Sequence, residues 1–368
     1  MTNRFTVSET GETGVTMVAF AKPKRKFRMN TPRMNVLLAG IFLGTAFAGT
    51  LRGVSLSSVG DFQQAGAFSM PPPAGPNRPA NVPDGYVITP VGYFHPSCVQ
   101  SLAKGERQLA DGRVQHSDGS IEEKVAVCSY PHYMYRRTPN NAGGANISTE
   151  NTEAKTSPEI SGYVESANLY SGSATKSYGA LIATWTVPPK PSTNDGQVLF
   201  FFTGFEYYND VQSILQPVLQ WYQGQWTLAS WNCCLNGIVT NSPYVNVTSD
   251  DQIYGSITSS CPAGTLSCAT WNVLTLDLST GQSTTLSDTP SAGQIFNWAF
   301  GAVLEADNIT TCDEYPSDRR VKFENIRLFD QDLHPIFDPK WDVAVDSNGT
   351  PQCDYGVKLT RRTVTLEY

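Results

Sequence analysis

One stretch, from Gln197 to Trp231, constrains the fold of this chain more than any other. It opens with a run of apolar residues, Val198 to Phe202, long enough for a strand buried on both faces. A turn-like segment, Thr203 to Asp210, follows, and the sequence then alternates strictly from Ile214 to Trp221. Because side chains on a strand point to opposite faces in turn, this pattern predicts paired strands rather than helices.

The alternation assigns the two faces of the second strand. One face is apolar enough to be the core side, whereas the other carries Gln216 and Gln220 among aliphatic residues. Buried amides without partners are costly, so these glutamines either line a wet groove, complete a buried polar network, or occupy ordinary half-exposed positions. Pro217 places the strand at an edge or a bulge, or leaves the side of its missing N–H unpaired. The predicted core face consists of Leu215, Pro217, Leu219 and Trp221.

The chain from Tyr170 onward consists of short strand-like segments separated by turn residues, with no long helical periodicity. This spacing predicts an all-β domain, an antiparallel β-sandwich of two curved, concanavalin-like sheets. The expected strands are 179–187, 197–204, 213–221, 226–231, 244–249, 251–258, 270–279, 283–287, 295–306, 320–330 and 356–368.

Composition restricts the class of partner. The 368 residues carry a net charge of -7, with a pI near 5.2, which argues against nucleic acid or an anionic membrane as a partner. Charged residues make up only 16%, as is common in secreted β proteins that work in acid. We expect a monomer that binds a protein or peptide.

The N-terminus predicts export. A basic run, Lys22 to Lys26, precedes an apolar block, Val36 to Ala48, that ends in a small-x-small cleavage pattern. Residues 1–51 are therefore interpreted as a signal peptide, with Met29 or Met34 as possible starts; a signal anchor is the alternative and would be the sole membrane contact. The bulk of the protein leaves the cytosol in either case. Glycosylation sequons occur at Asn146, Asn246, Asn308 and Asn348.

Two low-hydrophobicity segments divide the rest. Residues 52–84 form a Pro/Gly/Ser linker, and 137–168 form a second, flexible linker. Between them, 85–136 form a small disulfide-bonded, β-rich unit that we interpret as a propeptide. The β-sandwich domain then covers 169–368.

Eight cysteines fit an oxidising compartment, and none has zinc-site spacing. Cys98 and Cys128 are the natural pair of the small unit, and Cys261 and Cys268 bracket a local loop. Adjacent cysteines form a strained ring, so we expect no bond between the remaining adjacent pair. The pairing of the four remaining cysteines cannot be read from the sequence; one option joins Cys233 or Cys234 to Cys312 or Cys353. Histidines 95, 116 and 132 do not have the spacing of a metal site, so no metal and no cofactor is expected.

The familiar catalytic motifs are missing from the sequence: there is no G-x-S-x-G, HExxH or Gly-rich phosphate loop, and His334 is the only histidine of the β domain. An enzyme built on this domain would have to use carboxylates and amides. Glu305 is the only glutamate in the apolar strand-like run 295–306, where a carboxylate must be solvated, paired or perturbed.

The sequence TGFE followed by SILQPVLQW resembles the strand-turn-strand of the eqolisins, the fungal glutamic endopeptidases. The resemblance implies that Gln216 is one half of a catalytic dyad and Glu305 the other, although the family's glutamate is typically followed by tryptophan and Glu305 by Ala306. The segment WNCCLNGIV is similar to the related neprosin-like peptidases, which use two glutamates, so Glu206 is the alternative catalytic carboxylate.

By this resemblance the chain is a secreted, acid-acting glutamic endopeptidase that needs no metal. Gln220, Trp226 and Trp298 are the candidate substrate-binding residues. The alternative is a non-catalytic, lectin-like β-sandwich that binds carbohydrate or peptide, because aromatic and amide side chains on a curved sheet suit a sugar ring as well.

Overall fold

The computed structural model describes residues 71–75, 78–138, 141–147, 160–208, 213–347, 349 and 351–368. The predicted signal segment, most of the first linker and Asn348 lie outside these residues. Within the described part of the chain, no helix is long and apolar enough to cross a membrane. Strands dominate, and the only helical elements there are three short 3-10 turns, η1 (Pro96–Cys98), η2 (Leu235–Gly237) and η3 (Cys312–Glu314).

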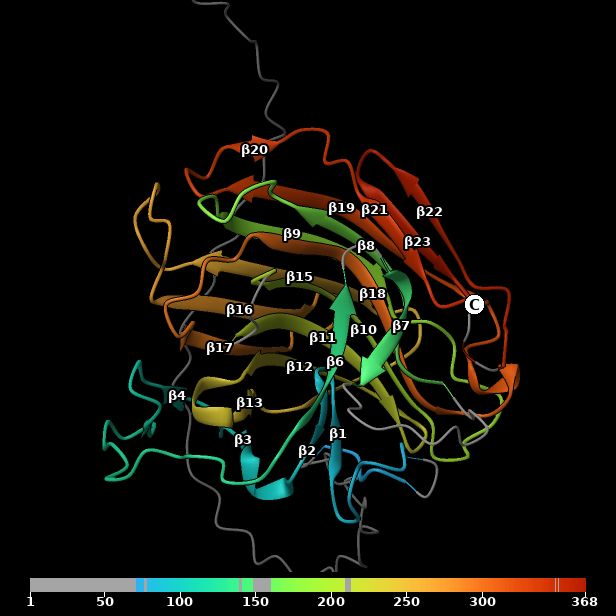
Figure 1. Ribbon diagram of the computed structural model, residues 1–368, viewed down its shortest axis with the longest axis horizontal. Helices are drawn as coiled ribbons and strands as arrows, with labels where there is room; N and C mark the ends of the chain where they lie inside the picture. The colour runs from blue at the N-terminus through green and yellow to red at the C-terminus, as the bar shows by residue number, and fades with distance from the viewer. Residues whose placement is uncertain are drawn as a thin grey trace, which may run out of the picture. The chain divides into compact units, whose positions relative to one another are not determined.

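Two large sheets form the main body of the fold, as Figure 1 shows. The first sheet has the order β21-β8-β18-β10-β11-β12-β13-β3, and β14 also pairs with β12. Its strands are β21 (Asp342–Val345), β8 (Ile160–Tyr170), β18 (Trp298–Ile309), β10 (Val198–Glu206), β11 (Ile214–Tyr222), β12 (Gln225–Cys233), β13 (Val239–Asn241), β3 (Val99–Ser101) and β14 (Val245–Val247).

The second sheet packs against the first and has the order β17-β16-β15-β9-β19-β23-β22, with β20 paired to β19. Neighbouring strands in both sheets are antiparallel except where β3 joins β13. The predicted all-β sandwich is thus the observed fold. The strands of the second sheet are β17 (Ser283–Pro290), β16 (Thr270–Asp277), β15 (Gln252–Ser259), β9 (Tyr178–Thr186), β19 (Arg320–Asp330), β23 (Thr363–Glu367), β22 (Gly356–Thr360) and β20 (Pro335–Ile336).

The core between the two sheets contains the face of β11 that the alternation predicted. Leu215, Leu219 and Trp221 are buried there with the inward side chains of the second sheet. A Cβ built on Gly255 of β15 would lie 2.7 Å from the Trp185 ring and 2.9 Å from Pro217 Cγ. Glycine is therefore required at this point for the two sheets to approach each other.

Pro217 does not lie in an edge strand. Its strand, β11, pairs with β10 on one side and β12 on the other. Towards β12, Pro217 is opposite Ser230. Towards β10, paired positions stop at Val218 and resume at Leu215. The missing N–H thus falls in an interruption of the ladder, which is the third of the three possibilities that the sequence left open.

The N-terminal unit, residues 71–138, lies against the outer face of the first sheet (Figure 1). β1 (Val87–Thr89) and β2 (Gly92–Phe94) form a hairpin within a four-stranded sheet that continues with β6 (Tyr133–Thr138) and β7 (Asn141–Ile147). β4 (Arg107–Gln108) and β5 (Val114–Gln115) form a second small hairpin. Parts of β6, β7 and β8 fall within the segment predicted as a linker, because the polar composition of that segment hides its strands. β6 pairs with its sequence neighbour β7, whereas β8 pairs with the distant strands β18 and β21.

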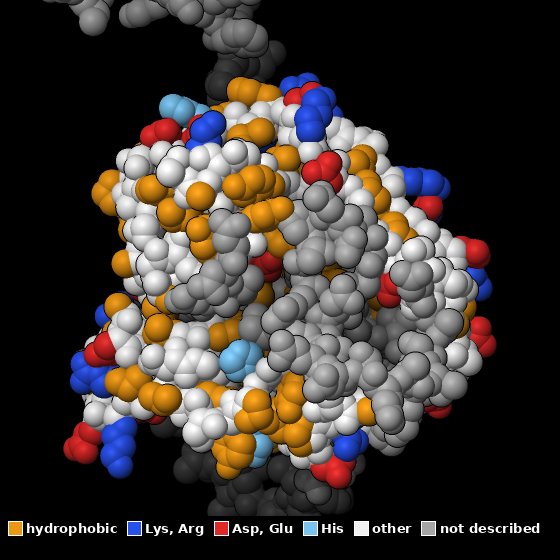
Figure 2. Space-filling model, viewed as in Figure 1, with side chains coloured by type: hydrophobic (Ala, Val, Ile, Leu, Met, Phe, Trp, Pro, Cys, Tyr) orange, Lys and Arg blue, Asp and Glu red, His pale blue; other side chains and the backbone are white. Residues whose placement is uncertain are grey.

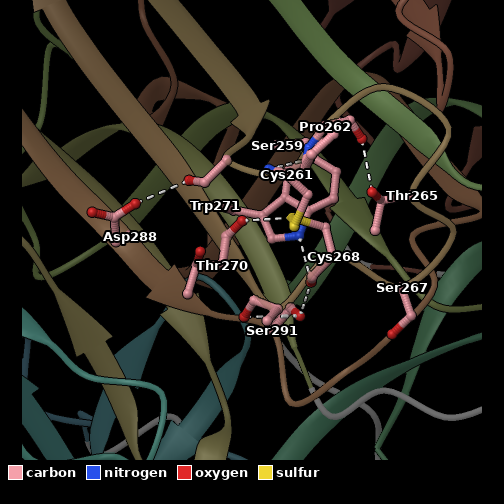
Figure 3. The surroundings of a disulfide bond; sticks show 12 residues. Ser259, Cys261, Pro262, Thr265, Ser267, Cys268, Thr270, Trp271, Asp288 and Ser291 are labelled. Carbon is pink, nitrogen blue, oxygen red and sulfur yellow. Dashed lines mark hydrogen bonds between the residues drawn. A yellow bond between two sulfur atoms is a disulfide. The ribbon is translucent and has the colours of Figure 1, made fainter.

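Four disulfides link the described cysteines. Cys98–Cys128 and Cys261–Cys268 are the pairs that the sequence suggested, and Figure 3 shows the loop closed by the second. In that loop Thr265 donates to the Pro262 carbonyl and the Trp271 indole donates to the Cys268 carbonyl. For the other four cysteines, whose pairing the sequence left open, the suggested bond from Cys233 or Cys234 to Cys312 or Cys353 is not formed. Cys312 and Cys353 are 41 residues apart in sequence, but the fold brings their Cα atoms within 5.5 Å and they form a disulfide. Cys233 therefore pairs with the remaining cysteine, Cys234.

Candidate active site

The outer face of the first sheet, which we call the groove face, carries the polar residues that the sequence singled out. Along β11 the alternation directs Gln216, Val218 and Gln220 to this face, opposite to the inter-sheet core. The N-terminal unit covers it with an apolar cluster that includes Ile88 and Val91. In consequence, the polar residues on this face are almost completely buried: Glu206, Gln216, Gln220, Glu305 and Asp307.

Gln216 contacts the tip of the β1–β2 hairpin. Its Nε2 donates to the carbonyl oxygen of Pro90 at 2.9 Å, and the side chain is 0% exposed. The other amide atom, Oε1, has no hydrogen-bond partner among the described residues. Gly204 of β10 lies close by, since a Cβ built on it would stand 3.5 Å from Gln216 Cγ, an ordinary van der Waals distance. The side-chain amide that the sequence predicted to be catalytic thus donates a hydrogen bond to the backbone carbonyl of Pro90.

Tyr163 of β8 contacts the same carbonyl from another strand. Its hydroxyl donates to the Pro90 oxygen at 3.1 Å, and its ring packs edge-on against Phe202, with the centroids 5.8 Å apart. Tyr163 is directly opposite Glu305 in the pairing of β8 with β18. Sequence reasoning missed this residue, because it falls in the stretch 137–168 that was interpreted as a linker.

Glu305 lies on β18, with Tyr163 on one side and Phe200 of β10 on the other. Phe200 is in turn opposite Gln220, so Gln220 is in register with Glu305, whereas Gln216 lies four residues earlier on β11. The backbones of β18 and β11 are roughly 10 Å apart, since β10 lies between them. The members of the predicted dyad therefore share one face without forming a cross-strand pair.

Asp307 is a further groove carboxylate that was not among the predicted site residues. It follows Glu305 by two positions on β18, and its Oδ1 accepts a hydrogen bond from the Tyr93 hydroxyl at 2.9 Å. Tyr93 belongs to β2, so the N-terminal unit hydrogen-bonds to both the Gln216 amide and the Asp307 carboxylate of the groove face. The alternation of β18 would have been enough to find Asp307.

Glu206 is the last residue of β10 and not a turn residue. It is 3% exposed and lies between Ile214 of β11 and Trp298 of β18. Trp298 belongs to the cluster under the N-terminal unit and packs near Phe300, with ring centroids 5.0 Å apart. Glu206 and Trp298 thus remain candidates for the roles that the sequence suggested.

Trp226 is not on the groove face, which corrects its expected role in substrate binding. It is 0% exposed in the core between the sheets and packs against Trp221 with ring centroids 5.1 Å apart. The physical reason is the hairpin register, in which Trp221 and Trp226 are opposite each other. Directly opposed residues in an antiparallel pair share one face of the sheet.

The predicted glycosylation sites differ in access. Asn246 is exposed on β14, whereas Asn308 is 7% exposed and donates to the Gly196 carbonyl. The backbone of Asn146 lies in β7, and its side chain is outside the described part, as is the whole of Asn348.

In the described part of the chain, several titratable groups outside the groove also have close neighbours. Asp330, Asp332 and His334 come within 4.8 Å of one another near the end of β19, but the Asp330 carboxylate already accepts from the backbone N–H groups of the other two. In the N-terminal unit His116 pairs with Glu106 at 2.7 Å. Burial lowers the pKa of His132, which stacks on Phe94.

In Figure 2, Lys and Arg side chains lie at the rim of the visible face, and apolar side chains form separate patches on it. The groove-face residues named above are amides and carboxylates, and none of them is a lysine or arginine that could neutralise an anion. Such a face suits a neutral, extended chain better than an anion.

No model of a protein family matches the chain, and no curated protein matches it. Solved glutamic peptidases are among the structures similar to it. Scytalido-glutamic peptidase with a peptide-based transition state analog is 19% identical, with a TM-score of 0.42, over 56% of this chain and 98% of that one. SCP-B, an eqolisin bound to the tripeptide Ala-Ile-His, is 18% identical over the same shares, with a TM-score of 0.40. Aspergilloglutamic peptidase from Aspergillus niger is 15% identical over 46% of this chain and 98% of that one, with a TM-score of 0.35.

Proposed function

We propose that this protein is the precursor of a secreted, acid-acting glutamic endopeptidase, with the N-terminal unit as its propeptide. The observation that supports this most directly is the hydrogen bond from the Gln216 amide to the backbone carbonyl of Pro90. Gln216, the residue proposed to polarise the substrate carbonyl, thus already donates a hydrogen bond to a peptide carbonyl. The four disulfides suit an extracellular site of action.

In the proposed reaction a substrate peptide takes the place of the β1–β2 hairpin. Glu305 acts as general base and removes a proton from the attacking water. The Gln216 amide donates to the carbonyl oxygen as negative charge develops on it, and its Oε1 helps to orient the water. Protonated Glu305 then returns the proton to the leaving nitrogen. Acid favours this last step, because it helps to protonate the departing amine.

The disulfide pattern supports removal of the N-terminal unit. Cys98–Cys128 lies wholly inside the unit, and the other three bonds join residues after 160. Of the disulfides in the described residues, none ties the unit to the sandwich. A cut between Thr138 and Ile160 would leave the unit held only by non-covalent contacts, which include the buried hairpin, the parallel pairing of β3 with β13 and the ion pair of Arg107 with Asp288.

The test is hydrolysis of a denatured protein from about pH 2.5 to 7, by the full chain before and after a cut between Thr138 and Ile160. We expect activity in acid after the cut, resistant to pepstatin and to chelators, and lost in both Gln216→Ala and Glu305→Ala. Gln197→Ala is the matched control, because Gln197 is also fully buried but donates to the Thr193 carbonyl away from the groove. This control should keep full activity.

Other outcomes assign the site differently. Activity that survives Gln216→Ala and is lost in Glu206→Ala would move the chemistry to two glutamates. No hydrolysis at any pH after release of the unit would refute the peptidase and favour the glycan-binding alternative. In that alternative Trp226 would not contact a sugar ring, because it lies between the two sheets.

A further inference from the structure

The Pro90 carbonyl oxygen is the point where two distant strands of the sandwich meet. Gln216 reaches it from β11 at 2.9 Å, and Tyr163 reaches it from β8 at 3.1 Å. In the sheet order, β18 and β10 lie between these two strands. A carbonyl oxygen has two lone pairs, and here both donors are side chains of the sandwich. Tyr163 is 8% exposed and Gln216 0%, so water is largely excluded.

This arrangement has the geometry of an oxyanion hole. Such donors lie about 2.7–3.1 Å from the oxygen and are fixed before the reaction begins, in a site from which water is excluded. Neither donor belongs to the N-terminal unit, so both remain when that unit leaves. The ring of Tyr163 is held against Phe202, and its strand neighbour is the proposed base, Glu305. A substrate carbonyl that replaces Pro90 would meet both donors.

We propose that Tyr163 is a catalytic residue, the second oxyanion donor of the groove. This rests on the proposed peptidase function. Water attacks the carbonyl carbon, its proton passes to the Glu305 carboxylate, and the carbonyl electron pair moves to the oxygen. That oxygen is stabilised by the Gln216 N–H and the Tyr163 O–H, and both donors keep their protons. The C–N bond then breaks, Glu305 returns the proton to nitrogen, and the products are a carboxylic acid and an amine.

The test is Tyr163→Phe in the chain cut between Thr138 and Ile160. The variant keeps the ring contact with Phe202 and removes only the hydroxyl. Loss of one oxyanion donor should lower kcat by about 10²–10³-fold and leave KM nearly unchanged, because the donor acts mainly in the transition state. Tyr178→Phe is the matched control. Tyr178 is also buried and also donates to a backbone carbonyl, that of Leu169, but it lies in the core between the sheets.

A second measurement separates catalysis from folding. A peptide with a tetrahedral secondary alcohol in place of the scissile carbonyl should lose affinity for Tyr163→Phe, and a product peptide should not. The thermal midpoints of both phenylalanine variants should be similar. If wild type hydrolyses peptide and Tyr163→Phe keeps its kcat within threefold, the assignment of Tyr163 is wrong and the peptidase stands. If wild type is inactive at every pH after the cut, the peptidase is refuted and this role of Tyr163 with it.

Discussion

Glu165 should make this protein more stable in acid than at neutral pH. It lies on β8, is 1% exposed, and accepts a hydrogen bond from the backbone N–H of Glu367 at 3.1 Å. Burial raises the pKa of its carboxyl to about 9, and the backbone hydrogen bonds from Glu367 and Gly356 only partly oppose this. Its charge also acts on three tyrosines, the buried Tyr315 and Tyr368 and the partly buried Tyr355, and the pKa of each is raised mainly by burial.

The sign of the effect follows from proton binding. In the unfolded chain Glu165 ionises above its ordinary pKa of 4.5, whereas in the folded protein it stays protonated up to about pH 9. Between these values the folded state binds more protons, so the free energy of unfolding falls as the pH rises. The full contribution is present below pH 4.5 and decreases by about 1.36 kcal/mol per pH unit above it. From pH 4.5 to 7 the loss is roughly 3 kcal/mol, a large part of the roughly 5–15 kcal/mol typical of a domain.

The assay is denaturant unfolding at several pH values between 4 and 8, followed by tryptophan fluorescence. Glu165→Gln keeps the shape and the acceptor for the Glu367 N–H but cannot ionise. We expect the variant to match wild type near pH 4 and to exceed its stability by roughly 3 kcal/mol at pH 7. Comparing the two proteins at each pH cancels other groups, including His132, whose lowered pKa makes stability rise with pH. Glu123→Gln, at an exposed position, is the control.

Parallel pH curves for wild type and Glu165→Gln would refute this reasoning. They would mean that Glu165 ionises in the folded protein at the same pH as in the unfolded chain, and that its environment is solvated. A variant less stable than wild type at pH 7 would show that the negative charge itself is stabilising.

Two further predictions concern packing and the groove. Replacing Cys261 and Cys268 with serine opens a loop with a sequence separation of 7, and should lower the free energy of unfolding by about 2–3 kcal/mol in a denaturant titration; an unchanged midpoint would contradict this. Trp298→Ala should raise KM for peptides, whereas Trp226→Phe should lower thermal stability and leave KM unchanged, since only Trp298 lies on the groove face. The reverse result in steady-state kinetics would show that the two faces are wrongly assigned.

Several parts of the candidate site could be predicted from sequence because they depend on local alternation. The period of two placed Gln216 and Gln220 on one face of β11 and Leu215 on the other, and it placed Glu305 and Asp307 together on β18. It failed for Trp226, because the face of that residue depends on the register of the hairpin with β11. It also failed for β8, where polar composition outweighed the strand pattern.

The pairing of cysteines shows the same division. Cys261 and Cys268 are near neighbours in sequence, so a short loop is enough to bring them together. Cys312 and Cys353 are 41 residues apart, and no local pattern connects them. The strain expected for adjacent cysteines favoured a partner for Cys233 elsewhere, but the other cysteines are already paired with one another.

The sequence by itself determined the class of fold and the two faces of each strong strand, since both follow from the side-chain period of an extended backbone. Only the tertiary structure decided that the glutamines of β11 are buried, and by what. Pro90 lies 126 residues from Gln216 and 73 from Tyr163, yet its carbonyl oxygen accepts hydrogen bonds from both. Contacts across such separations depend on sheet order and on the docking of the N-terminal unit, which no local pattern of residues encodes.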